Sequence, residues 1–317
     1  MDVSKSMELK FIGCMLGCAI GDALGASYEG RFFSDFKVSD ITFGGRWTDD
    51  THMMIGVAES LIECRGFNGE HMAWTFIRNW QREPWRGYGP GPPRVFRLIL
   101  SGVSWRKAAK KLYGGAGSLG NGAAMRVAPI ALLYHDDVDK LREVAYKSAE
   151  ITHAHELGME GAAVQAYAIA LALKINDGEF NPEDYLRDVA CFTKSGVFRD
   201  KLFRAIKLLD EDDKLVIIRE LGNGIESFNS VPTAIYCFAK NHDSYLKSIL
   251  YAVSLGGDAD TIASMTGAIA GAFHGEEGLP EEWVEKLEKA DYIKSLAREL
   301  WKLKESLRAC HQIITES

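Results

Sequence analysis

The sequence lacks the features that mark several common classes of protein. No stretch of its 317 residues is long and apolar enough to span a membrane. Its six cysteines contain no CxxC pair and lie mostly in apolar helical patterns, which indicates reduced, buried thiols in a cytoplasmic protein rather than a disulfide framework. Acidic residues outnumber basic ones, and the net charge of −7 argues against nucleic-acid binding as the main function.

The chain also shows no segment at which it would divide into domains. It contains no Pro/Ser-rich linker and no low-complexity tract, so we expect residues 1–317 to form a single domain. The apolar run 11–20 contains Leu16-Gly17-Cys18, which is similar to a lipoprotein cleavage site. Because the run is short and a Gly-Asp pair follows it at once, we interpret it as a helix rather than a processed signal.

Apolar residues recur with helical periodicity along most of the chain. Met53 and Leu61, for example, lie on one face of a helix that begins near Thr51. Strand signals are weak, and residues 40–43 provide the best of them. The sequence therefore predicts an all-α domain of stacked helices. Besides the helix near residue 51, helices are predicted at 8–20, 70–82, 141–152, 156–175, 183–193, 200–210, 213–221, 232–240, 243–254, 260–274 and 291–312.

Two acidic clusters stand far apart in the sequence, and each opens an apolar helical pattern. The first, residues 48–51, reads Thr-Asp-Asp-Thr, and the second, residues 258–261, reads Asp-Ala-Asp-Thr after two glycines. Helix capping explains part of the pattern, because Thr and Asp accept hydrogen bonds from the free amides of a first turn. Two carboxylates are more than a cap needs, however. Such oxygen ligands suit hard cations, so we expect a two-metal hydrolytic site if the fold joins the clusters.

Glycines are concentrated in two loops, at residues 86–91 and 114–122. Neither loop matches a Walker or Rossmann pattern. The second runs into a predicted helix start at 123–127, where backbone amides would suit a phosphate, although a flexible loop is the simpler interpretation. Tyr113 stands beside this loop and is a candidate for stacking on a base.

The other polar candidates have simple structural interpretations. His153 and His155 cannot share a helix face, so we expect His153 to form hydrogen bonds near the site and His155 to face solvent. Asp22 is expected to bond nearby amides after the first helix, and Glu29 taken alone indicates an exposed loop carboxylate. Four large aromatic residues are interpreted as core or loop anchors rather than a stacking platform: Trp74, Phe76, Trp80 and Trp85.

Taken together, four motifs resemble the ADP-ribosylglycohydrolases, the family that includes the dinitrogenase-reductase-activating glycohydrolase. They lie at 21–25, 47–51, 120–126 and 256–261, and the resemblance covers nearly the whole chain. It implies a compact, orthogonal multi-helix fold with two magnesium ions, or manganese in some members, in a central cleft. The branch that hydrolyses ADP-ribosylserine and poly(ADP-ribose) is the most similar, on the evidence of residues 28–29, 86–91, 221–225 and 230–238.

The resemblance also implies a role for each matching position. Six residues would be metal ligands: Thr48, Asp49, Asp50, Asp258, Asp260 and Thr261. Glu29 matches a mobile glutamate that touches the metal site or swings away to admit substrate. The residues expected to contact the ligand are Gly87 and Gly91 at the pyrophosphate and distal ribose, Gly117, Ser118 and Leu119 in the diphosphate loop, Tyr113 on adenine, and His153 and Ile225. Leu119 departs from the serine-specific branch, which carries a second adenine-facing aromatic there, so we expect a weaker hold on adenosine.

From these matches we expect hydrolysis at the anomeric carbon of ADP-ribose, with Glu29 and Asp258 as catalytic residues. The substrate would be the ADP-ribose moiety of serine-linked proteins or of the polymer, and the protein a cytoplasmic monomer without a nucleic-acid or membrane partner. Three alternatives stay open: an ADP-ribosylarginine hydrolase, a non-catalytic member similar to the lens crystallins, and an ADP-ribose-binding module without turnover. The presence of all six expected ligands argues against the crystallin-like alternative.

Overall fold

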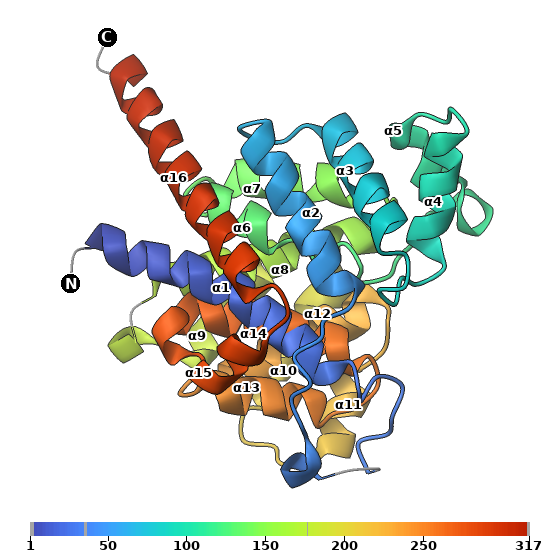
Figure 1. The fold of residues 1–317 in the computed structure, drawn as a ribbon. Helices are drawn as coiled ribbons and strands as arrows, with labels where there is room; N and C mark the ends of the chain where they lie inside the picture. The colour runs from blue at the N-terminus through green and yellow to red at the C-terminus, as the bar shows by residue number, and fades with distance from the viewer. Residues whose placement is uncertain (1–2, 35–36, 176, 316–317) are drawn as a thin grey trace.

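The computed structural model describes residues 3–34, 37–175 and 177–315, and within these ranges it contains helices and no β-strand (Figure 1). Its α-helices are α1 (Val3–Gly25), α2 (Asp49–Glu63), α3 (Gly69–Arg82), α4 (Gly91–Leu100), α5 (Trp105–Ala108), α6 (Ala128–Tyr134), α7 (Val138–Ala149), α8 (Glu156–Lys174), α9 (Pro182–Phe192), α10 (Gly196–Lys207), α11 (Lys214–Leu221), α12 (Ser227–Lys240), α13 (Tyr245–Val253), α14 (Ala259–His274), α15 (Glu281–Lys286) and α16 (Ala290–Thr315). Short 3₁₀ helices stand in the connections: η1 (Val38–Asp40), η2 (Ala109–Lys111), η3 (Tyr113–Gly115), η4 (Asp177–Glu179) and η5 (Glu276–Gly278). The all-α prediction is confirmed.

Helices α1 and α14 pack against each other along their lengths, near the centre of the molecule (Figure 1). Along one side of α1, a glycine recurs every four residues, at Gly13, Gly17, Gly21 and Gly25. A Cβ atom on Gly21 would lie 2.1 Å from the carbonyl oxygen of Ala263, and one on Gly17 would lie 2.3 Å from that of Gly267. Because only glycine permits so close an approach, this repeat determines where the two helices meet.

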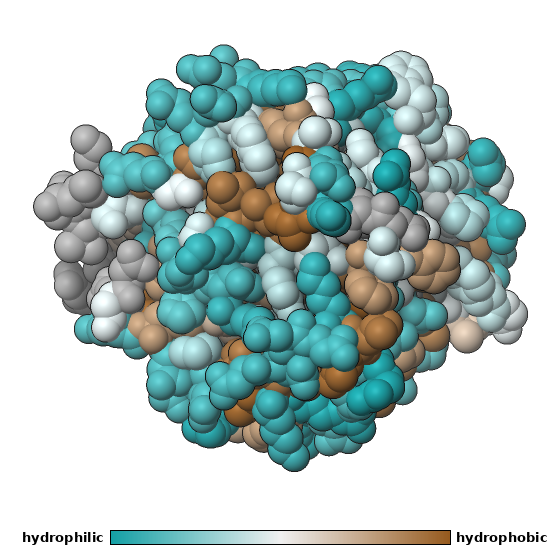
Figure 2. Space-filling model, turned by 90° about the horizontal axis from the view of Figure 1, so that it is seen from below, coloured by the Kyte–Doolittle hydropathy of each residue, from teal (hydrophilic) through white to brown (hydrophobic). Residues whose placement is uncertain are grey.

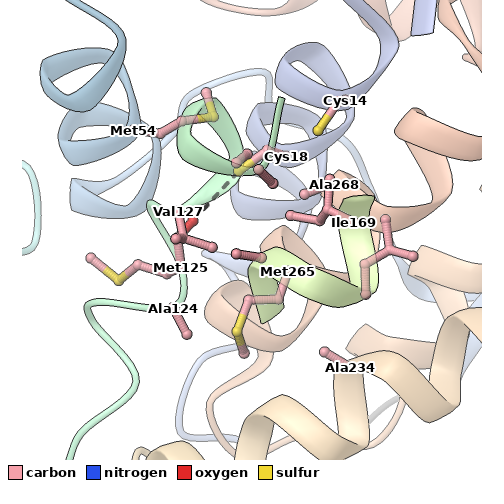
Figure 3. Close-up of a cluster of buried hydrophobic side chains, with 14 of the residues drawn as sticks. Cys14, Cys18, Met54, Ala124, Met125, Val127, Ile169, Ala234, Met265 and Ala268 are labelled. Carbon is pink, nitrogen blue, oxygen red and sulfur yellow. Dashed lines mark hydrogen bonds between the residues drawn. The ribbon is translucent and has the colours of Figure 1, made fainter. Parts of the chain in front are cut away.

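The remaining core is built around this helix pair. Helices α8, α12 and α13 pack on α14, while α2, α6 and α16 pack on α1. Figure 3 shows part of this core, where the thiol of Cys18 on α1 lies 3.7 Å from the backbone carbonyl oxygen of Met125, and Cys14 lies further along the same helix. The Cys18 thiol lies 3.2 Å from the hydroxyl of Ser264 on α14. Burial raises the pKa of both cysteine thiols, so these groups fill space and are chemically inert.

Three secondary-structure predictions differ from the structure. Residues 40–43 form no strand, because η1 ends at Asp40 and an irregular connection leads to α2. Helix α1 continues past Gly21 to Gly25, since its last turn still packs on α14. The expected helix start at 123–127 is a series of turns, and α6 begins only at Ala128.

Side-chain exposure also corrects two expectations. Cys14, Cys18 and Cys237 are buried, but two of the other free thiols, Cys191 and Cys310, are exposed, so burial was predicted for too many cysteines. Trp85 is 64% exposed and Trp74 is 40% exposed, so neither is packed as an anchor in this fold. On the face shown in Figure 2, hydrophobic residues form separate patches among polar ones. Among the described residues, no helix combines the length and the hydropathy needed to cross a membrane.

Candidate metal centre and ligand cleft

The carboxylate of Asp22, on α1, holds the beginning of α2. It is buried and accepts hydrogen bonds from the backbone N–H and the hydroxyl of both Thr48 and Thr51, at 2.6–3.0 Å. Asp22 therefore caps the first turn of α2 from a neighbouring helix, which confirms the expectation that its carboxylate bonds nearby amides. The side chain of Thr48, in the N-cap position, forms no capping bond to its own helix. Capping thus leaves Asp49 and Asp50 without a structural explanation.

Asp258 occupies the corresponding position at the start of α14. Gly256 and Gly257 precede it with φ angles of +65° and +69°, which glycine adopts readily. The backbone N–H of Asp258 donates to the carbonyl of Asn223 at 2.9 Å. Its carboxylate accepts a hydrogen bond from Nδ2 of Asn121 at 2.5 Å. Asp258 also forms no side-chain cap, so helix capping does not explain this cluster either.

The two acidic clusters meet where α2 and α14 begin. Oγ1 of Thr261 lies 3.5 Å from Oδ2 of Asp50, which links the second cluster to the first. Carboxylate oxygens of Glu29, Asp258 and Asp260 lie within 4.8 Å of one another. Magnesium and calcium ions bind oxygen ligands at about 2.0–2.6 Å, so oxygens at this spacing can share an ion. The fold thus brings together the clusters that the sequence separates.

The electrostatics of this group fit a cation. Oδ1 of Asp50 is buried without a hydrogen-bond partner among the described residues. Burial, followed by the charge of neighbouring carboxylates, raises the pKa of Asp49 to about 8. Burial raises the pKa of Asp258 to about 6, and the pKa values of Asp50 and Asp260 are raised for the same reasons. A bound cation would favour the ionised form of every one of these groups, so the residues present suit a metal.

This acidic group lines a cleft of about 190 Å³ that both glycine-rich loops also line. All six predicted metal ligands and Glu29 contribute to it. So do six of the predicted ligand contacts: Gly87, Gly91, Tyr113, Ser118, His153 and Ile225. Gly117 and Leu119 do not line the cleft. Gly117 packs against Ala154, and the carbonyl of Leu119 accepts a hydrogen bond from the N–H of Ser227 at 3.0 Å.

The two histidines have different roles. His153 is buried at the cleft, where Nδ1 and the hydroxyl of Thr152 lie 2.8 Å apart. Burial lowers the pKa of His153 to about 3, so its ring is neutral at physiological pH. His155 is half-buried, and its Nδ1 accepts a hydrogen bond from the N–H of Leu157 at 3.1 Å, as the N-cap of α8. The expectation that His155 faces solvent is therefore wrong.

Asn121 is the residue that the sequence analysis missed. Its Nδ2 donates to Asp258 and, at 3.1 Å, to the hydroxyl of Ser230. Its backbone N–H donates to the carbonyl of Ile225 at 2.9 Å. Asn121 therefore orients a proposed metal ligand and ties the glycine-rich loop to the segment before α12. The available signal was a polar side chain between two glycines in the motif at 120–126.

Comparison with known proteins identifies the family of this chain. The ADP-ribosylhydrolase ARH3 of Bos taurus is 36% identical, in a match that covers 92% of each chain. The ADP-ribosylarginine hydrolase Tri1 of Pseudomonas putida is 27% identical, over 91% of this chain and 77% of its own. A solved structure described as an ADP-ribosylglycohydrolase-related protein complex has a TM-score of 0.75 at 27% identity, covering 95% of this chain and 99% of its own. Residues 4–309 match the family model for ADP-ribosylglycohydrolase, and the chain therefore belongs to the ADP-ribosylglycohydrolase family.

Proposed function

We propose that the protein is a metal-dependent hydrolase that releases ADP-ribose from serine-linked ADP-ribosylated proteins, from poly(ADP-ribose), or from both. The observation that carries this proposal is the convergence of Glu29, Asp258 and Asp260 in a cleft that also contains a glycine-rich loop and Tyr113. The 36% identity to ADP-ribosylhydrolase ARH3 supports the choice of reaction. We further infer a cytoplasmic monomer that acts on ADP-ribosylated protein without a nucleic-acid or membrane partner.

The cleft offers separate groups for the nucleotide part of the substrate. The side chain of Tyr113 is 57% exposed, so its ring is available to stack on adenine. The hydroxyl of Ser118 accepts a hydrogen bond from the N–H of Gly120 at 3.2 Å, and the amides of this loop suit the diphosphate. The predicted contacts of Gly117 and Leu119 require the ligand to reach beyond the cleft lining.

The six predicted ligands would hold two Mg²⁺ ions, with Mn²⁺ as the alternative. All six offer oxygen, and no sulfur or nitrogen donor belongs to the set, which favours these hard cations. When bound, the ions would orient the ribose hydroxyls and activate a water. The chain itself keeps the ligands in position, because Asp22 restrains Thr48 and Asn121 restrains Asp258.

Glu29 and Asp258 are the proposed proton-transfer groups. Glu29 is exposed on the loop after α1, yet its carboxylate belongs to the same group of oxygens as Asp258 and Asp260. It can therefore exchange protons with solvent and with a reacting water or leaving group in the cleft. A carboxylate near the anomeric carbon also stabilises the oxocarbenium-like transition state of glycosidic cleavage.

The test is an incubation of the protein with a serine-linked peptide, an arginine-linked peptide and the polymer, with and without Mg²⁺, followed by detection of free ADP-ribose. Release from the serine-linked peptide or the polymer, lost on chelation, supports the proposal. Release from the arginine-linked peptide alone would select the N-glycosidic alternative, to which the 27% identity to Tri1 points. Binding of ADP-ribose without release from any substrate would assign a binding module or a crystallin-like protein.

A further inference from the structure

A second hollow lies directly beside the reaction cleft and shares part of its wall. It has a volume of about 320 Å³ and is lined by the end of α1, the segment before α2 and the turn that carries Trp85. Thr48 and Gly87 line both hollows. The loop after α1 also reaches both, since Ser27 lines the second hollow and Glu29 lines the cleft. The second hollow, here named the side groove, therefore opens next to the proposed metal ligands.

The turn that carries Trp85 is firmly anchored, whereas its indole ring is exposed. The next residue, Arg86, is only 5% exposed, and its guanidinium lies 3.7 Å from the centre of the Trp47 ring. Arg86 forms two hydrogen bonds with Glu288, at 2.6 and 2.8 Å, and an ion pair with Glu83. Trp85 nevertheless leaves 64% of its surface exposed. A large ring on a rigid support loses little entropy on binding, which suits an interface anchor.

The charge of the side groove differs from that of the reaction cleft. Among the described residues that line the groove, none is Asp or Glu, whereas the cleft is lined by the four aspartates of the acidic clusters and Glu29. Arg46 lines the groove, is exposed, and forms no hydrogen bond or ion pair with any residue in the described ranges. Arg86 is already paired with Glu83 and Glu288. Arg46 is therefore the cation that the groove offers to a partner, and it favours an acidic one.

We propose that the side groove binds the polypeptide that carries the ADP-ribosyl group, with a preference for an acidic residue beside the modified position. This inference rests on the proposed function, because the acceptor chain lies across the scissile bond from the ribose. With the nucleotide in the cleft, the acceptor polypeptide has to extend away from the proposed metal ligands in a different direction. The groove adjoins the proposed metal ligands at Thr48. In this proposal the Trp85 ring contacts the peptide, and Arg46 pairs with the carboxylate of its acidic residue. No bond is made or broken in the groove.

The experiment compares kcat/KM on three substrates: ADP-ribosylserine as the free amino acid, a peptide with Glu beside the ADP-ribosylserine, and the same peptide with Lys there. Trp85→Ala should lower kcat/KM on both peptides by about fivefold to tenfold and leave the free amino acid unchanged. Arg46→Glu should reverse the order of the two peptides. Matched controls are Trp74→Ala on α3, at a position 40% exposed, and Lys302→Glu on α16, also exposed. Neither residue lines the groove, so both controls should behave as wild type.

Two results would overturn the assignment. Equal losses on the free amino acid and the peptides would place Trp85 in the shared cleft, and unchanged peptide kinetics in both groove variants would remove the groove from binding. If wild-type protein released no ADP-ribose from any of the three substrates or from poly(ADP-ribose), the proposed function would fail instead. Calorimetric titration of the peptides into wild-type and Trp85→Ala protein would then decide separately whether the groove binds them.

Discussion

Replacing Gly21 with alanine should disturb the fold and the site together. A Cβ atom at this position would lie 2.1 Å from the carbonyl oxygen of Ala263, whereas ordinary contacts begin at 3.4 Å. The clash is with backbone, so no change of rotamer relieves it, and α1 must move away from α14 by roughly 1 Å. Overpacking of this kind typically destabilises a protein by about 1–3 kcal/mol, and we expect the upper end of that range because both partners are backbone.

The same movement should reduce catalysis. Asp22 follows Gly21 directly, and Asp260 packs against Gly25 on the next turn of α1, so separating the helices displaces groups on both sides of the proposed metal centre. A misplacement of about 1 Å can lower a rate by about 100-fold, which is the loss in kcat that we expect.

The assay combines urea unfolding, followed by circular dichroism, with release of ADP-ribose. The matched control is Gly196→Ala at the start of α10, where a Cβ atom would meet no other atom within 4 Å. This control should keep its activity and be equally or slightly more stable, because alanine favours the helix. Wild-type stability and activity in Gly21→Ala would refute the reasoning about the helix contact.

Four further predictions concern the site. Asp258→Asn and Asp49→Asn should each abolish ADP-ribose release while circular dichroism shows an intact fold. Glu29→Gln should lose activity at an unchanged unfolding midpoint, and retained activity would exclude Glu29 from proton transfer. Asn121→Ala should weaken metal binding by about 10-fold to 100-fold in calorimetry, because Asp258 loses its orienting partner. Protons compete with cations for the carboxylates of Asp258 and Asp49, whose pKa values are raised to about 6 and about 8. Metal affinity should therefore rise with pH between about 6 and 8, and an affinity that does not change with pH would contradict the competition.

Local sequence signals were sufficient for most helices and for the two acidic clusters that the fold brings together. Helical periodicity identified amphipathic helices such as α2, on which Met53 and Leu61 are buried. The acidic clusters were recognisable because two carboxylates at one helix start exceed what a cap requires. Helix α4 was not predicted, since it begins in a segment rich in glycine and proline, although proline is well tolerated in a first helical turn.

Long-range contacts could not be predicted in the same way. The meeting of the two clusters depends on the helix pair α1 and α14, whose glycine repeat was visible in the sequence but gave no partner. Asp22 illustrates the difficulty, because the helix that it caps begins 27 residues later, at Asp49. His155 and Trp85 were placed wrongly for a related reason. Their exposure depends on which backbone groups and side chains the folded chain brings beside them.

The central hypothesis is that the clusters at 48–51 and 258–261 form one metal centre for glycosidic hydrolysis. The most direct measurement strips the protein of metal by chelation, adds back Mg²⁺ or Mn²⁺, and determines the ions bound per chain while ADP-ribose release is followed. We predict that wild-type protein binds two ions and recovers activity as they bind, and that Asp258→Asn binds fewer and recovers none. Full turnover by the metal-free protein would contradict the hypothesis.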